Sequence, residues 1–413
     1  MRIIWNLGPK RAHLAPESSD DDSQNRRNFS LVLGGPLYQL LLRAHLSDDA
    51  LLLVRQRIVT ISLFAWLPLL LLSALEGSLL SKDLTVPFLT DIEVHLRFLV
   101  AVPLLIAAEL VVHQRLRGIA QAYLDRNLVP EAAMDQFNAA INAALRLRNS
   151  VVGEALLVAI VYGVGVLVIW RHYTALQATT WYATDADGHS KLSLAGIWYG
   201  YVSLPIFQFL LIRWYFRLFI WMRFLWQTSR IKLSLIPTHP DCVGGLGFLA
   251  NTAHAFSLLL AAHGVMLAAN LANRIIFLDA ALPDFKMEIG VMVMFLLAVV
   301  FGPLLVFSPQ LAQAKRRGLN EYGTLAERYV REFDAKWLRG GVSADEPLVG
   351  SGDIQSLADL GNSFEVVRGM RLAPITKDAI VQLAAAVLIP VAPLALTIMP
   401  LEDLLKHLFG LLF

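Results

Sequence analysis

The stretch IGVMVMFLLAVVFGPLLVFS, residues 289–308, runs for twenty residues without a charged side chain. A helix needs about 20 apolar residues to cross the hydrocarbon core of a bilayer, so this stretch is long enough by itself. Other stretches qualify or come close, at about 57–79, 97–113, 151–170, 194–214, 246–271 and 379–399. The sequence therefore predicts an all-α polytopic membrane protein with about seven transmembrane helices.

The composition of the whole chain agrees with this fold class. Of 413 residues, 56% are hydrophobic and 16% are charged, whereas soluble domains carry about 25% charged residues. The net charge of +2 is small and indicates no nucleic-acid partner. The single cysteine excludes an intrachain disulfide framework.

The charges between the spans predict an orientation. The segments after the second, fourth and sixth spans are rich in arginine and lysine, and the other connections are shorter and poorer in them. The positive-inside rule then places the N-terminus in the cytoplasm. We expect a multi-pass protein that contacts membrane lipid and keeps its arginine-rich end inside the cell.

Several spans are expected to continue past the bilayer as helices. Pro130 suits the first turn of a helix, and one helix of about 40 residues is predicted from there to Trp170. Residues 113–150 would then form a cytoplasmic helical hairpin. The fourth span is expected to run to Arg230 and the sixth to Leu338, so the sequence predicts a cytoplasmic helical bundle.

The chain divides into segments by composition. We predict a disordered segment at 1–30, an amphipathic interfacial helix at 31–50, the transmembrane bundle with cytoplasmic helical extensions at 51–338, a cytoplasmic loop and short helix at 339–378, and the last span with an amphipathic tail at 379–413. The short helix is expected at about 353–370, with Ser351 or Asp353 as its cap. The last span is interrupted by prolines, so a broken or re-entrant segment is an alternative there.

The fifth span carries polar residues at membrane depth. At about 100° per residue, His263, Asn270 and Arg274 lie on one helix face. One interpretation is an ion pathway or a ligand-facing surface, because ionisable groups in spans are costly. The alternative is hydrogen bonding between helices that stabilises the bundle.

Two acids lie in apolar runs of neighbouring spans, Glu109 in the second and Glu154 in the third. Together they are candidates for binding a cation or carrying protons. The alternative is a salt bridge to Arg115, to Arg148 or to an arginine of the fourth span.

The inner end of the fourth span interleaves arginines with aromatic residues. Arg213 and Arg217 are expected either to reach the anionic headgroups or to line an inner mouth that attracts anions. We group His239, Asp241 and His254 with this inner mouth, because the positive-inside orientation places all three near the same surface.

The loop IPTHPDCVGGLGFL, residues 236–249, holds three metal-ligating side chains within four residues: His239, Asp241 and Cys242. A metal site there would need a further ligand from elsewhere. The alternative is a turn between helices, with Asp241 as a cap and the glycines permitting a tight bend. No sequence motif of a known enzyme class is present, and no cofactor is expected apart from that metal.

Three motifs carry a resemblance: GGPLYQLLL at 34–42, LIPTHPDCVGGLGFL at 235–249 and SGDIQSLADLGNS at 351–363. Through them the sequence resembles a family of uncharacterised bacterial inner-membrane proteins. The resemblance implies a location in the bacterial inner membrane. It implies no activity, so no functional residue is carried over.

These observations support three hypotheses for function. The first is a homo-oligomeric membrane channel or transporter for a small ion, gated or scaffolded by the cytoplasmic bundle. The second is a membrane scaffold or sensor subunit that binds a protein partner through that bundle. The third is a membrane metalloenzyme that uses the HPDC loop.

Overall fold

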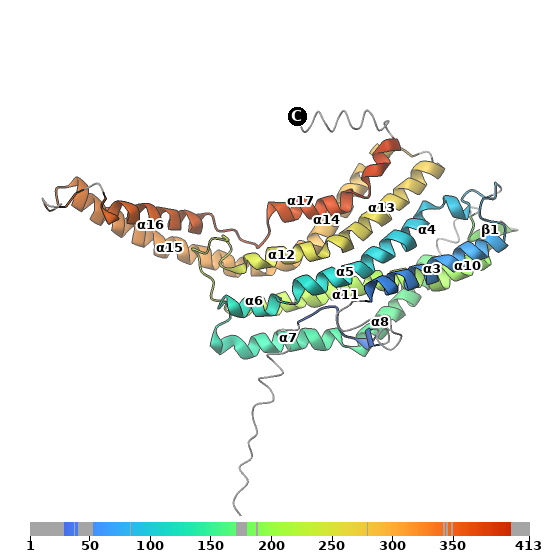
Figure 1. Cartoon of the computed structure of the whole chain (residues 1–413), viewed down its shortest axis with the longest axis horizontal. Helices are drawn as coiled ribbons and strands as arrows, with labels where there is room; N and C mark the ends of the chain where they lie inside the picture. The colour runs from blue at the N-terminus through green and yellow to red at the C-terminus, as the bar shows by residue number, and fades with distance from the viewer. Residues whose placement is uncertain are drawn as a thin grey trace, which may run out of the picture.

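The computed structural model describes residues 29–397, except 37, 40–52, 83, 171–179, 187–188, 279, 342, 344–345 and 348–349. Within this part of the chain the fold is helical, as predicted, with one short β-hairpin. Long helices lie side by side along the length of the molecule (Figure 1). Five helices in the described part are long and apolar enough to cross a membrane, or up to six if a bent pair counts as one span.

The five candidate spans cover Val54–Leu75, Ile92–Asp125, Leu194–Ser229, Leu246–Leu278 and Leu282–Leu338. Their α-helical parts are α3 (Val54–Leu75), α4 (Ile92–Leu96), α5 (Val102–Leu116), α6 (Ile119–Asp125), α10 (Leu194–Trp198), α11 (Leu204–Ser229), α12 (Ala250–Ala253), α13 (Ser257–Leu278), α14 (Lys286–Phe301) and α15 (Ser308–Phe333). A two-residue turn at 117–118 joins α5 to α6, and short 3-10 or π-helical segments join the other parts without ending the span.

The predicted continuous helix from Pro130 to Trp170 is wrong. The first half is a 3-10 turn (Glu131–Ala133) and α7 (Met134–Arg148), and the second is α8 (Val151–Ile160) and a π-helical segment (Val161–Trp170). The two halves meet at an angle of 48°. The Ser150 hydroxyl accepts a hydrogen bond from the Gly153 amide at 3.1 Å and so caps α8. The chain therefore bends where a capping serine begins the second helix.

The seventh predicted span, 379–399, begins as α17 (Lys377–Leu388), which the Thr376 hydroxyl caps. This helix has twelve residues, fewer than the roughly 20 that a span needs. A 3-10 segment, Ala392–Thr397, follows it. The rest of that prediction, with the amphipathic tail, lies outside the described residues.

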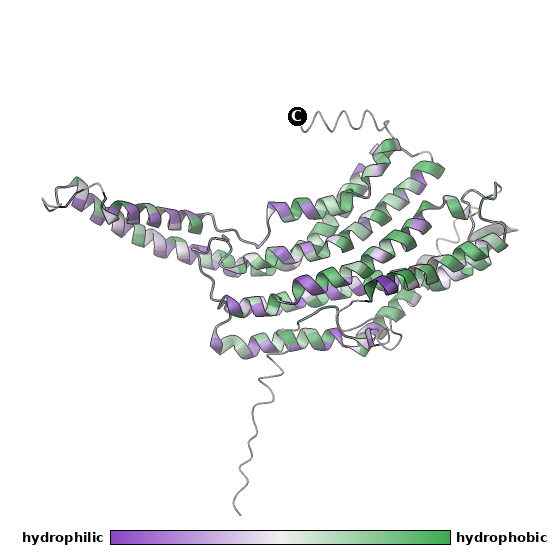
Figure 2. Ribbon diagram, in the orientation of Figure 1, coloured by the Kyte–Doolittle hydropathy of each residue, from purple (hydrophilic) through white to green (hydrophobic). Residues whose placement is uncertain are grey.

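Two predicted extensions of the spans are confirmed. The fourth span continues as helix to Ser229, and the sixth continues through α15 to Leu338. The short helix is present as α16 (Gly352–Arg368), and the Ser351 hydroxyl accepts from the Asp353 amide at 3.1 Å. The α15–α16 hairpin projects away from the other helices (Figure 1) and is more hydrophilic than they are (Figure 2).

The N-terminal predictions lie mostly outside the described residues. Of the segment 1–30, Phe29 and Ser30 are described, and both are buried. The Phe29 ring packs against Phe224 of α11 with centroids 4.8 Å apart. Gly34 and Gly35 both have positive φ, a backbone conformation that glycine adopts at little steric cost. Phe29 is therefore part of the core.

The β-hairpin was not predicted. It pairs β1 (Ala183–Ala186) with β2 (His189–Leu192) in an antiparallel register. The sequence between these strands is Asp-Gly, a common two-residue hairpin signal that the apolar patterns around it obscure. The strands follow Trp181, which is buried and anchors this end of the molecule.

Close helix packing explains one buried glycine. Helix α13 packs against α17, α4 and α5, and a Cβ atom added at Gly264 would collide with the Val387 carbonyl oxygen of α17. Only glycine permits this approach of the two backbones.

We therefore expect Gly264→Ala to lower the free energy of unfolding by about 1–3 kcal/mol, because overpacking forces α13 and α17 apart. Equilibrium unfolding of the purified protein in mixed micelles measures this loss. Gly290→Ala is the matched control, since a Cβ atom there meets nothing within 4 Å. Equal unfolding curves for wild type and Gly264→Ala would contradict the packing argument.

Candidate functional site

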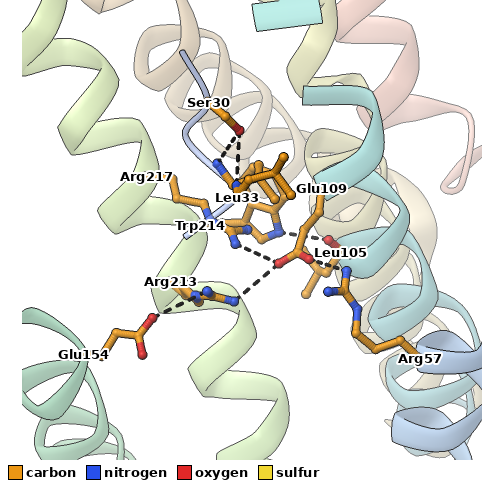
Figure 3. Close-up of polar contacts among 10 residues, drawn as sticks. Ser30, Leu33, Arg57, Leu105, Glu109, Glu154, Arg213, Trp214 and Arg217 are labelled. Carbon is orange, nitrogen blue, oxygen red and sulfur yellow. Dashed lines mark hydrogen bonds and ion pairs between the residues drawn. The ribbon is translucent and has the colours of Figure 1, made fainter. Parts of the chain in front are cut away.

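A buried cluster of charges lies where α3, α5, α8 and α11 meet. At its centre is Glu109 of α5, which is 4% exposed. Its carboxylate pairs with Arg57 of α3, with Arg217 of α11 at 2.8 Å and with Arg213 of α11 at 3.5 Å (Figure 3). One carboxylate thus accepts contacts from three guanidinium groups on two other helices.

Arg213 links this centre to a second acid. Its other nitrogen lies 3.4 Å from a carboxylate oxygen of Glu154 of α8, on the far side from Glu109 (Figure 3). The charge cluster, defined as Arg57, Glu109, Glu154, Arg213 and Arg217, therefore holds three arginines and two glutamates. At neutral pH its members carry one excess positive charge.

Neighbouring groups fix the orientation of the cluster. The Trp214 indole donates a hydrogen bond to the Leu105 carbonyl oxygen at 3.0 Å, which ties α11 to α5. The Arg217 guanidinium lies 4.8 Å from the centre of the Trp214 ring. The Ser30 hydroxyl accepts from the Leu33 amide and contacts the His113 ring, so the N-terminal turn packs over the same region (Figure 3).

The sequence left two interpretations open for the glutamates and two for the arginines of the fourth span, and the contacts in the structure distinguish them. Glu109 and Glu154 do pair with an arginine of the fourth span, which was the alternative to a cation site. Arg213 and Arg217 are buried against Glu109 instead of reaching toward headgroups, so that interpretation is wrong for both. The sequence did not single out Arg57 as a site residue, because it lies at the end of the first predicted span, where arginines are common.

A cavity of about 430 Å³ opens beside the cluster. Arg57, Glu109 and Arg213 form its polar wall, and the other lining side chains are mostly apolar. These are Thr60, Ile61, Phe64, Ile106, Val158, Val161, Tyr162, Pro205, Ile206, Phe209 and Leu210. The cavity therefore offers two guanidinium groups at one wall and apolar surface over the rest.

His263 and Arg274 of the fifth span have partners on different helices. The His263 ring contacts the Tyr215 hydroxyl of α11 at 2.8 Å. Arg274 pairs with Glu288 of α14 at 2.8 Å, and Asn270 is half-buried on α13. The contacts of His263 and Arg274 fit hydrogen bonding between helices, and the ion pathway along this face stays a prediction.

The HPDC loop folds into a turn around Asp241. Its carboxylate accepts from the backbone amides of Val243 and Gly247 at 2.8 Å and of Gly245 at 3.2 Å, which confirms it as a cap. Burial alone would raise the pKa of Asp241, but these amides and nearby His239 bring its pKa below the ordinary value. The cap therefore stays ionised at neutral pH.

The residues assigned to an inner mouth and to a metal site have separate surroundings. Arg213 and Arg217 contact Glu109, while His239 lies 3.0 Å from Asp241 in the loop. His254 begins a 3-10 turn that packs on α5. Among the residues that the structure describes, no group of three His, Cys, Asp or Glu side chains is placed to hold a metal ion. In the described part of the chain, Cys242 therefore belongs to no such group either.

No family model, curated protein or solved structure matches this chain. The site is accordingly assigned from its own contacts, burial and charge. Of the features above, the charge cluster with its cavity is the one that combines buried charge with space for a ligand.

We expect Glu109→Gln to lower the free energy of unfolding by about 3–5 kcal/mol, because it leaves buried arginines without their shared counter-charge. Unfolding in mixed micelles measures the effect. Glu288→Gln is the control: its pair with Arg274 is about two-fifths exposed, so the loss there should stay within about 0–1 kcal/mol. Equal losses in the two variants would show that the cluster does not stabilise the bundle.

Proposed function

We propose that this protein is a multi-pass membrane channel or transporter for a small ion, and that the ion is an anion. The supporting observation is the charge cluster, in which three arginines face two glutamates beside the 430 Å³ cavity. Burying unbalanced charge at membrane depth is costly and is characteristic of functional sites. An anion that enters the cavity would balance the excess charge.

The guanidinium groups have the donors that such an ion needs. Each guanidinium carries five N–H donors, and the two carboxylates of the cluster use only some of them. Arg57 and Arg213 belong to both the cluster and the cavity wall. A carboxylate or sulfonate placed between them would receive charge-assisted hydrogen bonds.

The remaining walls favour an anion with an apolar part. Ile61, Phe209 and Leu210 offer no hydrogen bonds to replace the water around a hydrated halide. They do offer contact to a short hydrocarbon chain, whose burial is favourable by about 0.8 kcal/mol per CH₂. We therefore expect organic anions with a short apolar chain to bind better than chloride.

The proposal includes the orientation and location expected from the sequence. The α6–α7 and α15–α16 regions, which are rich in arginine and lysine, are proposed to lie in the cytoplasm as a helical bundle. The protein would then reside in the bacterial inner membrane, with the chain beyond α17 completing a seventh span. The cavity belongs to one copy of the chain, so each subunit of the proposed homo-oligomer would bind its own anion.

Transport of hexanesulfonate tests the proposal. This anion has a short apolar chain and stays charged at neutral pH, so it crosses lipid slowly by itself. Liposomes that contain the protein should accumulate it faster than empty liposomes and faster than they accumulate chloride. Leu210→Trp, which fills the cavity without replacing a charged group, should lower the initial rate about ten-fold or more.

The matched control is Leu71→Trp, at an exposed position of α3 that does not line the cavity. Its rate should equal that of the wild type. Uptake no faster than in empty liposomes would overturn the proposal, as would full activity in Leu210→Trp. The same preparation gives the oligomeric state, which tests the proposed homo-oligomer separately.

The α15–α16 hairpin favours a second candidate, a scaffold or sensor subunit. It projects from the bundle (Figure 1), and Leu325 and Val330 are each 50% exposed on it. We expect the full chain, isolated from native membranes, to hold a partner protein in fixed stoichiometry, and Val330→Glu to release it. A chain that purifies only with copies of itself would contradict this candidate.

A further inference from the structure

A pocket of about 210 Å³ lies between the end of α11 and the first half of α15. We call it the basic pocket, and its lining residues are Arg230, Lys232, Leu233, Leu235, Gln310, Gln313, Ala314 and Arg317. Helix α10, which begins the span that contains α11, lies at the opposite end of the molecule from the α15–α16 hairpin (Figure 1). The function proposed above uses none of these residues.

The charged residues of the basic pocket are all cations. Arg230, Lys232 and Arg317 are exposed, so a ligand can reach them, and the lining includes no acid. None of the three forms an ion pair with another described residue. A cleft lined by charge of one sign focuses the electric field and concentrates counter-ions. The basic pocket therefore attracts anions.

The side chain of Gln310 fixes the two walls of the pocket against each other. Its NH₂ group donates to the backbone carbonyl oxygens of Ser229 and Ile231, with a distance of 2.7 Å to the latter. Carbonyl oxygens at the end of a helix carry partial negative charge and would repel an anion. Here Gln310 binds them, and it also holds the start of α15 against the end of α11.

The three cations approach the pocket from both walls. The Arg230 guanidinium lies 5.0 Å from the centre of the Trp226 ring, which restricts its position at the end of α11. Lys232 lies between two buried residues of the chain that follows α11, so its side chain faces outward. Arg317 lies seven residues, or about two turns, after Gln310 on the same face of α15.

A phosphate monoester suits this set of cations better than a carboxylate does. It carries a charge of about −1.5 to −2 at pH 7 and three strong acceptor oxygens. Guanidinium groups match phosphate oxygens with two parallel hydrogen bonds. A water molecule occupies about 30 Å³ in the liquid, so a pocket of about 210 Å³ has room for the few heavy atoms of a phosphate group.

We propose that the basic pocket binds a phosphate monoester group. Arg230 and Lys232 donate to its oxygens from the α11 side, and Arg317 donates from α15. The Trp226 side chain beside Arg230 is 47% exposed, a position that suits the interface between membrane and water. Basic pockets at the cytoplasmic ends of membrane helices bind lipid headgroups. The ligand is accordingly either a free phosphate ester or the headgroup of an anionic lipid, and both present the same group.

Glycerol 3-phosphate and phosphatidic acid test the proposal, because they carry the same phosphate monoester without and with acyl chains. Isothermal titration calorimetry measures glycerol 3-phosphate binding to the full-length protein in phosphatidylcholine nanodiscs. Native mass spectrometry measures phosphatidic acid retained by the protein in detergent. Saturable binding of glycerol 3-phosphate identifies a free ester as the ligand, and retention of phosphatidic acid alone identifies the lipid. Acetate, with a single charge, should not bind in the same calorimetric measurement.

A matched pair of variants tests the position of the site. Arg317→Gln and Arg316→Gln remove the same charge from neighbouring exposed positions of α15, and only Arg317 lines the pocket. Arg317→Gln should weaken binding about ten-fold or more, whereas Arg316→Gln should change it by no more than about two-fold. Equal affinity in the two variants, or no binding of either ligand to the wild type, would overturn the proposal and show an ordinary solvated basic surface.

Discussion

The carboxylate of Glu109 connects three helices at one buried point. It lies on α5 and pairs with Arg57 of α3 and with Arg213 and Arg217 of α11. Apolar contacts between membrane helices have little directional preference, because lipid chains are as apolar as leucine. A slide of one helix by a single turn, about 5.4 Å, would separate these charges. The cluster therefore sets the register of three helices along their axes.

A second polar anchor sets the register at the other end of the bundle. Asp91 joins α4 to α13 through Asn273 and to the β-hairpin region through Trp181. With Glu109 at one level and Asp91 at another, two separate points fix α4 and α5, which belong to one continuous span. Because these polar contacts align the helices, the apolar side chains between them do not have to fill all the space. Cavities can therefore remain between the helices without loss of alignment.

Local patterns and non-local contacts differ in how well the sequence predicted them. The spans followed from the length of apolar runs, and the Ser351 and Asp241 caps followed from residues within a few positions of the groups they bind. The break at Ser150 was missed because the helical pattern continues on both sides of it. Pairing of Arg57 with Glu109 joins residues 52 positions apart, and no local pattern in the sequence indicates it.

The arginines of the fourth span show what decides between a lipid-facing and a protein-facing charge. Arginines can alternate with aromatic residues along a helix whether they face lipid or protein. Only the residues that lie next to them in the folded chain distinguish the two situations. Once Arg213 and Arg217 are buried against Glu109, their excess charge becomes a property of the protein interior and not of the membrane surface. Such a charge requires a counter-ion from within the molecule or from a ligand.

Helix α11 separates the cavity beside Glu109, of about 430 Å³, from a second cavity of about 300 Å³ beside Asp91. Pro205, Ile206 and Phe209 line the cavity beside the arginines, while Phe207 and Gln208 line the cavity beside Asp91. Residues at these spacings point to different sides of a helix. One cavity carries an excess of positive charge and the other an excess of negative charge. The two sides of one helix therefore face surroundings of opposite charge, which the helix keeps apart.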